Sequence, residues 1–191
     1  MLPISSWKRG RNTTGNNTLT FRKAEARDLD AAEAIYDKIH AREDAGLTTI
    51  GWITGVYPIR QDAQEALARG DLYVYEQDGH VVASGIINQR QVDVYADGNW
   101  LFFAPDDKVM VLHTLTVDPD CGGRGIGRAF AQFYEQLAQD AGCTVLRIDT
   151  NECNTAARHL YASLGYREAD IVTCDFNRIP AIHLVLLEKK L

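Results

Sequence analysis

Residues 117–130 read VDPDCGGRGIGRAF, and this stretch decides how the rest of the sequence is interpreted. A predicted strand ends at Pro119, four glycines fall within residues 122–127, and a predicted amphipathic helix follows. The first N–H groups of a helix have no internal partner, and the helix dipole is positive at that end. Glycine lets the backbone approach an anion closely, and Arg124 and Arg128 add positive charge. The stretch therefore predicts a binding loop for a phosphorylated cofactor.

Two common nucleotide-binding patterns do not match this loop. A dinucleotide fingerprint, G-x-G-x-x-G, that starts at Gly125 and Gly127 requires a third glycine at Phe130. A P-loop that starts at Gly122 and reaches Gly127 requires a lysine and a hydroxyl residue next, and the chain has Arg-Ala there. A nucleotide-dependent enzyme such as a small kinase is thus disfavoured.

A second stretch, residues 154–166, reads NTAARHLYASLGY and predicts a helix that is ended by a glycine. On a helix, residues three and four apart share a face, so Asn154, Ala157 and Tyr161 lie close together. A predicted strand at Val145–Thr150 separates the two stretches. A single asparagine or tyrosine here is explained equally well by a helix cap or a core aromatic, but the ordered pair of stretches is specific.

Together the two stretches resemble the motifs of the GNAT (Gcn5-related) N-acetyltransferases, and the resemblance covers residues 109–188. The loop is similar to [QR]-x-x-G-x-[GA], with Gly122 in place of the leading Gln or Arg, and the helix is similar to N-x-x-A-x-x-L-Y-x-x-L-G-[FY]. The resemblance implies an acyltransferase that uses acetyl-CoA as cosubstrate. It implies cofactor contacts from Leu115, Thr116, Val117, Gly122, Gly123, Arg124, Gly125, Ile126, Gly127, Arg128, Asn154, Ala157 and Tyr161.

The resemblance also implies the chemistry, which is direct attack of a primary amine on the thioester. Tyr161 is expected to protonate the CoA thiolate, because a thiol of pKa about 8.5 leaves best beside an acid. Asp149 is the first candidate for the general base, since the ribosomal-protein alanine N-acetyltransferases carry a glutamate there. His113 is the second candidate, and Glu152 and Glu43 are weaker ones. Both leading candidates also have an ordinary structural explanation, as a loop cap and a core histidine.

The remaining pattern predicts one mixed α+β domain over residues 18–191, after a flexible tail at residues 1–17. The resemblance implies a GNAT fold with a mostly antiparallel sheet of six to seven strands, a splayed central pair and about four helices. Strands are expected at Leu19–Lys23, Leu72–Glu76, His80–Asn88, Val109–Val117, Val145–Thr150, Ile171–Cys174 and Ile182–Leu187. Helices are expected from Leu29 to near Gly46 with Asp28 as the cap, over Arg60–Ala68, from Ile126 to Ala141 and over Thr155–Leu164.

The substrate side is much less defined by the sequence. Trp52, Tyr57, the irregular segment 91–107 (expected to form an extension or hairpin arm) and Phe176 are expected to wall the acceptor pocket. The acceptor itself, a small-molecule or peptide amine, stays open, as do a homodimer and a non-catalytic acyl-CoA-binding module.

Composition removes other classes of function. The net charge of −6 over 191 residues argues against a nucleic-acid binder. No apolar run suits a signal peptide or a membrane span, so a cytoplasmic location without membrane contact is expected. The four cysteines lack metal-ligand spacing, so free thiols and no metal are expected. No His or Asp arrangement marks Cys121 or Cys153 as a nucleophile.

Overall fold

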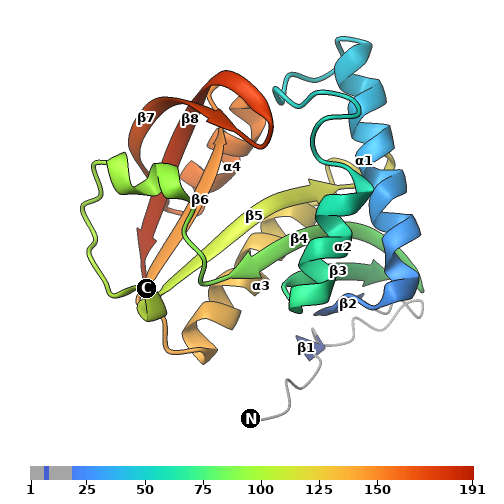
Figure 1. Ribbon diagram of the computed structural model, residues 1–191. Helices are drawn as coiled ribbons and strands as arrows, with labels where there is room; N and C mark the ends of the chain where they lie inside the picture. Colours follow the sequence, from blue (N-terminus) through green and yellow to red (C-terminus); the bar gives the residue numbers. More distant parts are fainter. Residues whose placement is uncertain (1–6, 9–18) are drawn as a thin grey trace.

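The computed structural model describes residues 7–8 and 19–191, and their strands form one twisted sheet (Figure 1). The strand order is β1-β2-β3-β4-β5-β6-β8-β7, and among these strands only β5 and β6 pair in parallel. The bounds are β1 Trp7–Lys8, β2 Leu19–Lys23, β3 Leu72–Gln77, β4 His80–Asn88, β5 Val109–Val117, β6 Val145–Asn151, β7 Arg167–Phe176 and β8 Ile179–Lys190. The predicted α+β class with a mostly antiparallel mixed sheet is confirmed.

The predicted flexible tail lies outside the described residues except for β1. This two-residue strand pairs with β2 at Thr20 and Phe21 and extends the sheet to eight strands. The division into a tail and a single domain stays a prediction.

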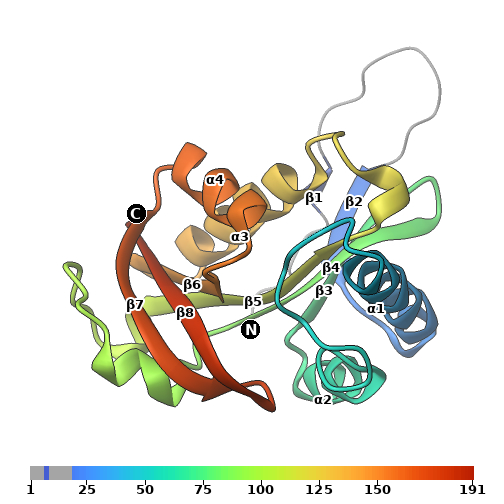
Figure 2. The ribbon, with the colours of Figure 1, turned by 90° about the horizontal axis from the view of Figure 1, so that it is seen from above.

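Four α-helices in the described part of the chain cover both faces of the sheet (Figure 2). They are α1 Leu29–Asp44, α2 Arg60–Arg69, α3 Ile126–Asp140 and α4 Thr155–Ser163. Helices α1 and α2 lie on one face, and α3 and α4 lie on the other. The α3 face holds the larger apolar core, in which Phe130 and Tyr134 are fully buried. Tyr134 Oη also donates to the carbonyl oxygens of Met110 (2.6 Å) and Arg147 (3.0 Å), which ties α3 to β5 and β6.

The two central strands separate halfway along their length. β5 and β6 pair only from Val109 opposite Val145 to Leu112 opposite Ile148, although both strands continue beyond that point. On its other side β5 shifts register against β4, and Thr114 has a positive φ of 50°. A bulge of this kind bends the strand and ends regular pairing. The expected splayed pair is therefore present, and it opens a V at the carboxyl ends of β5 and β6.

Segment 91–107 is not the hairpin arm that was one expectation for it. It forms two short 3₁₀ turns, η2 Asp93–Asp97 and η3 Asp106–Lys108, which pack on the α2 side of the sheet beside β6 and β8 (Figures 1 and 2). Tyr95 and Trp100 are buried there, and Trp100 Nε1 donates to the Tyr95 carbonyl oxygen at 2.6 Å. The irregular spacing of these aromatics suits packing onto a sheet face better than pairing along a strand edge.

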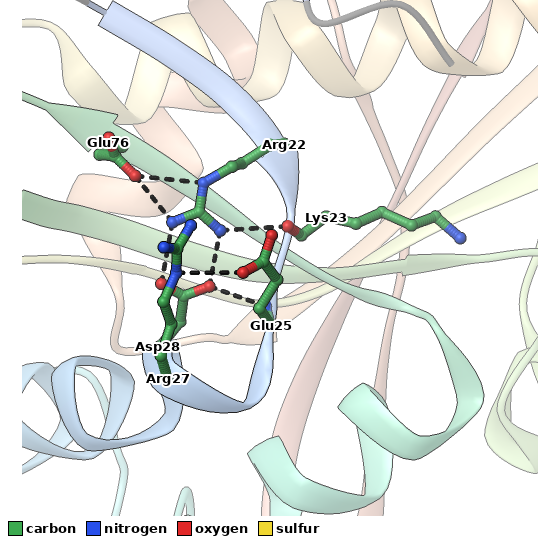
Figure 3. Close-up of polar contacts among 6 residues, drawn as sticks. All are labelled: Arg22, Lys23, Glu25, Arg27, Asp28 and Glu76. Carbon is green, nitrogen blue, oxygen red and sulfur yellow. Dashed lines mark hydrogen bonds and ion pairs between the residues drawn. The ribbon is translucent and has the colours of Figure 1, made fainter. Parts of the chain in front are cut away.

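Asp28 does not cap α1 through its side chain, contrary to the expectation. Its carboxylate instead receives two hydrogen bonds from Arg22 (2.6 and 2.9 Å) and one from the Glu25 N–H (2.7 Å), as Figure 3 shows. Arg22 also bonds Glu76 on β3. Burial favours the neutral acid, but the hydrogen bonds from Arg22 and Glu25 outweigh it and lower the pKa of Asp28. The cluster joins β2, β3 and the start of α1.

Strands β7 and β8 are longer than predicted. β7 begins at Arg167 instead of Ile171, and β8 runs to Lys190 instead of Leu187. The sequence pattern predicted only the apolar centre of each strand, because charged residues such as Glu188 are not typical of a strand interior. Glu188 is fully buried, and its carboxylate accepts hydrogen bonds from the N–H groups of Leu101 and Phe102 at 2.9 and 3.0 Å.

Candidate active site

A groove with a volume of about 650 Å³ runs along the open end of β5. The glycine loop and the N-terminal ends of α3 and α4 form one wall, and α1 with the loop after it forms the other. Nearly all of the residues predicted to bind the cofactor line it: Leu115, Thr116, Val117, Gly122, Gly123, Gly125, Ile126, Gly127, Arg128, Asn154, Ala157 and Tyr161. The exception is Arg124, whose side chain is exposed and does not line the groove.

The glycine loop has the geometry that an anion needs. Gly125 is the N-cap of α3 in the left-handed conformation (φ 74°), and Gly123 has φ 76°. Side chains with a Cβ rarely adopt this region, so glycine is required here. No side chain caps α3, and its first turn carries no acidic residue. The N–H groups at this helix end are therefore available to a phosphate.

The wall of the groove that α1 and the following loop form was not predicted from the sequence. Ile39 and Arg42 come from α1, and Thr48, Ile50 and Trp52 come from the loop after it. The Arg42 side chain makes no hydrogen bond or ion pair within the described residues, although its charge acts on Asp120, so its guanidinium donors remain available to a phosphate. The helical pattern of the sequence around Arg42 does not indicate that the C-terminal end of α1 faces the glycine loop.

Tyr161 lies at the inner end of this groove. It is 5% exposed and packs edge-on against Tyr166, with 5.7 Å between ring centroids. Its hydroxyl has no hydrogen-bond partner among the described residues, and burial raises its pKa above that of a free phenol. Tyr161 is therefore a protonated, unengaged donor. Asn154, seven residues earlier, accepts the Ala157 N–H at 3.1 Å through Oδ1, so its helix-cap explanation is correct and leaves its amide nitrogen available.

A small inner cavity of about 70 Å³ lies in the V between β5 and β6. Tyr161 lines it together with Asp149, Thr114, Tyr57 and Trp52. The hydroxyls of Tyr57 and Thr114 are hydrogen-bonded to each other across it. The inner cavity thus brings the predicted acid and the first predicted base to one place.

Asp149 is a half-buried residue whose carboxyl group has a single side-chain partner in the described structure. Burial raises its pKa to about 6, and the hydrogen bond from the Tyr95 hydroxyl at 2.7 Å opposes that shift. Tyr95 belongs to η2, so the unpredicted packing of segment 91–107 supplies the partner. A carboxyl group with a pKa near 6 is ionised at neutral pH and still a useful base.

A second cavity of about 330 Å³ opens on the α2 face of the sheet, between α2 and the start of segment 91–107. We call it the outer cavity. It is lined by Tyr57, Asp62, Glu65, Arg69, Ile86, Asn88, Arg90, Gln91, Val92, His113, Thr114, Asp149, Phe176 and Asn177. Asp149 and Tyr57 line both the inner and the outer cavity. Tyr57, Phe176 and the beginning of segment 91–107 thus line this cavity, while Trp52 lines the inner cavity and the groove; that they wall an acceptor pocket stays a prediction.

His113 lies in the outer cavity and does not line the inner one. Its Nε2 is 3.3 Å from Asn88 Oδ1. The same oxygen accepts the Arg90 N–H, and the Asn88 amide nitrogen donates to Asp71, so the amide orientation is fixed and Nε2 is the donor. Burial lowers the pKa of His113 to about 4. His113 is therefore neutral at pH 7 and a weaker base than Asp149.

The two weaker base candidates are engaged elsewhere. The Glu43 carboxylate accepts the N–H groups of Ile50 and Gly51 and the Thr48 hydroxyl, which shapes the loop after α1. Glu152 pairs with His183 Nδ1 at 3.1 Å on the surface. Neither lines the groove or the two cavities.

The four cysteines are free thiols, as expected. In the described part of the chain, no group of three or more His, Cys, Asp or Glu side chains is placed to hold a metal ion. Within the same part, no helix has the length and apolar character that a bilayer span requires.

The fold and the site define a protein in which a V-shaped opening of the sheet joins an uncapped helix N-terminus to a half-buried carboxyl group. A family model described as the Acetyltransferase (GNAT) family matches residues 33–166, and the chain belongs to that family. This confirms the resemblance found in the sequence.

Relatives and solved structures agree with this assignment. An uncharacterised N-acetyltransferase of Methanocaldococcus jannaschii is 31% identical over 98 residues, which are 51% of this chain and 42% of that protein. The ribosomal protein bS18-alanine N-acetyltransferase of Escherichia coli is 37% identical over 60 residues, 31% of this chain and 40% of that protein. The matches thus span only about two fifths of these relatives' own length.

Two solved structures share the fold over most of both chains. A GNAT-family acetyltransferase structure from Streptococcus agalactiae has a TM-score of 0.75 at 21% identity, covering 91% of this chain and 95% of that one. A Salmonella typhimurium structure determined with its cofactor acetyl-CoA has a TM-score of 0.61 at 19% identity, covering 90% and 93%.

Proposed function

We propose that this chain transfers the acetyl group of acetyl-CoA to a primary amine. The observation that carries the proposal is the inner cavity, because it places Asp149 and Tyr161 on one small space. The anion-binding groove leads to that space from one side, and the outer cavity leads to it from the other. A thioester and an amine can thus approach each other from opposite faces of the sheet.

The groove suits acetyl-CoA in shape and chemistry. The uncapped end of α3 offers N–H groups to the pyrophosphate, and Arg42 and Arg128 add positive charge at the rim. Beyond them the lining is apolar, with Leu115, Val117 and Leu160 suited to the pantetheine arm. The Salmonella typhimurium structure, which has the same fold and was determined with acetyl-CoA, supports this proposal.

The residues of the inner cavity account for the protons of the reaction. Asp149 removes one proton from the ammonium, so that the neutral amine nitrogen attacks the thioester carbonyl carbon. Leu115, in β5 beyond the bulge, lines the cavity and has no register partner on β4, and we assign its backbone N–H to the carbonyl oxygen as negative charge develops. As the C–S bond breaks, Tyr161 donates its proton to the thiolate. The attacking nitrogen loses a second proton as the amide forms, and this proton replaces the one that Tyr161 gave to the thiolate.

Asp149 is the better base on both position and pKa. It lines both cavities, whereas His113 lines only the outer one. With a pKa of about 6 it is closer to the working pH than His113, whose pKa is about 4. We assign His113 to the wall of the acceptor cavity.

The test is release of free CoA thiol from acetyl-CoA in a panel of amines, with calorimetric binding of acetyl-CoA measured in parallel. We expect Tyr161→Phe and Asp149→Asn each to lower kcat by about 10²- to 10⁴-fold while acetyl-CoA binding is retained. Tyr73→Phe is the matched control, since Tyr73 is also a buried tyrosine but lines neither cavity nor groove. Full activity in Tyr161→Phe would remove the acid role from Tyr161.

The alternative is a non-catalytic acyl-CoA-binding module, which needs the groove but neither Tyr161 nor Asp149. It would bind acetyl-CoA tightly and release no thiol with any amine. The outer cavity argues against it, because a module that only binds the cofactor has no need of a second access to the thioester.

A further inference from the structure

The outer cavity has charged groups of opposite sign at its two ends. It runs along α2, with Asp62 in the first turn of the helix and Arg69 in the last. Seven residues of helix separate these two by about 10 Å. The two ends of the cavity can therefore recognise different groups on one ligand.

The end near the first turn of α2 is acidic. Asp62 accepts two hydrogen bonds from Arg178, which lies on the turn between β7 and β8, and one from the Ile59 N–H. Glu65 also acts electrostatically on Arg178. Two carboxylates against one guanidinium leave this end with a net negative charge. Asp149 adds a carboxylate on the inner side.

The end near the last turn of α2 is basic. Arg69 pairs with Asp71 at 3.0 Å, whereas the Arg90 side chain makes no ion pair or hydrogen bond within the described residues. Two guanidinium groups against one carboxylate leave this end with a net positive charge. Both arginines line the cavity, and both act electrostatically on His113, as does Asp71.

The strand register separates this basic end from the reaction centre. Arg90 follows Asn88, which pairs with Val111 on β5, whereas Asp149 follows Ile148, which pairs with Leu112. Arg90 thus lies toward the start of β5, on the other side of His113 from the V. A ligand that fills the cavity can place one group at Asp149 and another at Arg90.

We propose that the acceptor is a small zwitterionic amine, an amino acid or a close analogue, whose carboxylate is held by Arg90 with help from Arg69. Its ammonium is then directed to Asp149 at the acidic side of the cavity. A volume of about 330 Å³ suits a small molecule. This inference rests on the proposed acetyltransferase activity and adds the class of acceptor to it.

The experiment compares pairs of acceptors that differ only in the anionic group, such as an amino acid and its carboxamide. Thiol release gives kcat/KM for each, with rates referred to the concentration of the ammonium form, which is the form that Asp149 is proposed to deprotonate. A carboxylate held by a guanidinium should favour the acid by about 10- to 100-fold, mostly through KM. A diamine of the same length and a dipeptide complete the panel.

Variants assign the preference to Arg90. In Arg90→Gln the acid should lose its advantage, because its KM rises while that of the carboxamide does not. Arg90→Lys keeps the charge and should retain part of the preference. Arg27→Gln is the control, since Arg27 is an exposed arginine paired with Glu25 and lines neither cavity nor groove. Thermal unfolding is measured for each variant.

The outcomes separate the two proposals. Equal rates for acid and carboxamide, a preference for the diamine or the dipeptide, or a preference that survives Arg90→Gln would overturn the zwitterion inference and leave the acetyltransferase standing. If the protein binds acetyl-CoA but releases no thiol with any member of the panel, both proposals are overturned.

Discussion

Replacing Tyr95 with phenylalanine should move the pH dependence of the reaction without removing activity. Tyr95 is 3% exposed, and its hydroxyl donates to Asp149 at 2.7 Å. The ring packs against Trp100 at 5.2 Å between centroids, and phenylalanine preserves that contact. The substitution therefore removes one hydrogen bond to the proposed base and little else.

The size of the shift in pH dependence follows from the charge of Asp149, which accepts the hydrogen bond from Tyr95. The pKa of Asp149 is about 6, so about nine-tenths of it is ionised at pH 7. A hydrogen bond to a charged group contributes about 1.5–3 kcal/mol, which corresponds to roughly one to two pKa units. Because the bond stabilises the carboxylate, its loss raises the pKa of Asp149 to about 7–8. At pH 7 the ionised fraction then falls to between about one half and one tenth.

The assay is kcat/KM from thiol release between pH 5 and pH 10. The acidic limb should shift upward by about one to two units, the rate at pH 7 should fall about 2- to 10-fold, and the rate above pH 9 should recover. Tyr73→Phe should leave the acidic limb of the kcat/KM profile at its wild-type pH. An unshifted limb in Tyr95→Phe, or a rate that stays low at every pH, would refute the assignment of Asp149 as the titrating base.

Three further changes test the acceptor wall, the glycine loop and the fold. Arg178→Met removes the guanidinium that partly neutralises Asp62 and Glu65, so the KM of an ammonium-bearing acceptor should fall about 2- to 5-fold while calorimetry shows unchanged acetyl-CoA binding; an unchanged or raised KM would contradict this. Gly125→Ala places a Cβ at φ 74° at a cost of about 1–2 kcal/mol, so acetyl-CoA affinity should fall about 10-fold by calorimetry, and wild-type affinity would disprove the argument. Asp28→Asn breaks the ion pair with Arg22, which keeps Glu76 as a partner, and should cost about 1–3 kcal/mol in urea unfolding at pH 7. Since the folded-state pKa of Asp28 is lowered, this stabilisation is present above the ordinary carboxyl pKa and is lost as the pH falls, so the variant and the wild type should converge in acid.

The cofactor half of the site could be predicted because its geometry is local. The N-terminal end of a helix binds anions wherever it occurs, and Asn154 and Tyr161 share a face because of helical spacing alone. Asp149 could be placed because it ends a strand next to the V. In each of these cases the relevant neighbours lie within one or two elements of the chain.

The acceptor half could not be predicted because its contacts join distant parts of the chain. Tyr95 meets Asp149 across 54 positions, and Arg178 meets Asp62 across 116. No local period encodes such pairs. Arg42 was missed for the same reason, since only the packing of α1 brings its last turn to the glycine loop. The acceptor is therefore inferred from charges that the fold assembles.

One irregularity, the bulge at Thr114, brings the two halves of the site together. A β-branched residue at φ 50° is unfavourable by roughly 1–3 kcal/mol, and its hydroxyl is held by Tyr57, from the loop that precedes α2. The bulge lies two residues after Leu112, the last residue of β5 that pairs with β6, and Leu115 beyond it lines the inner cavity. The same separation lets Asp149 line both cavities. Local strain in β5 is thus the feature that lets the proposed cofactor groove and the proposed acceptor cavity meet at Asp149 and Tyr161.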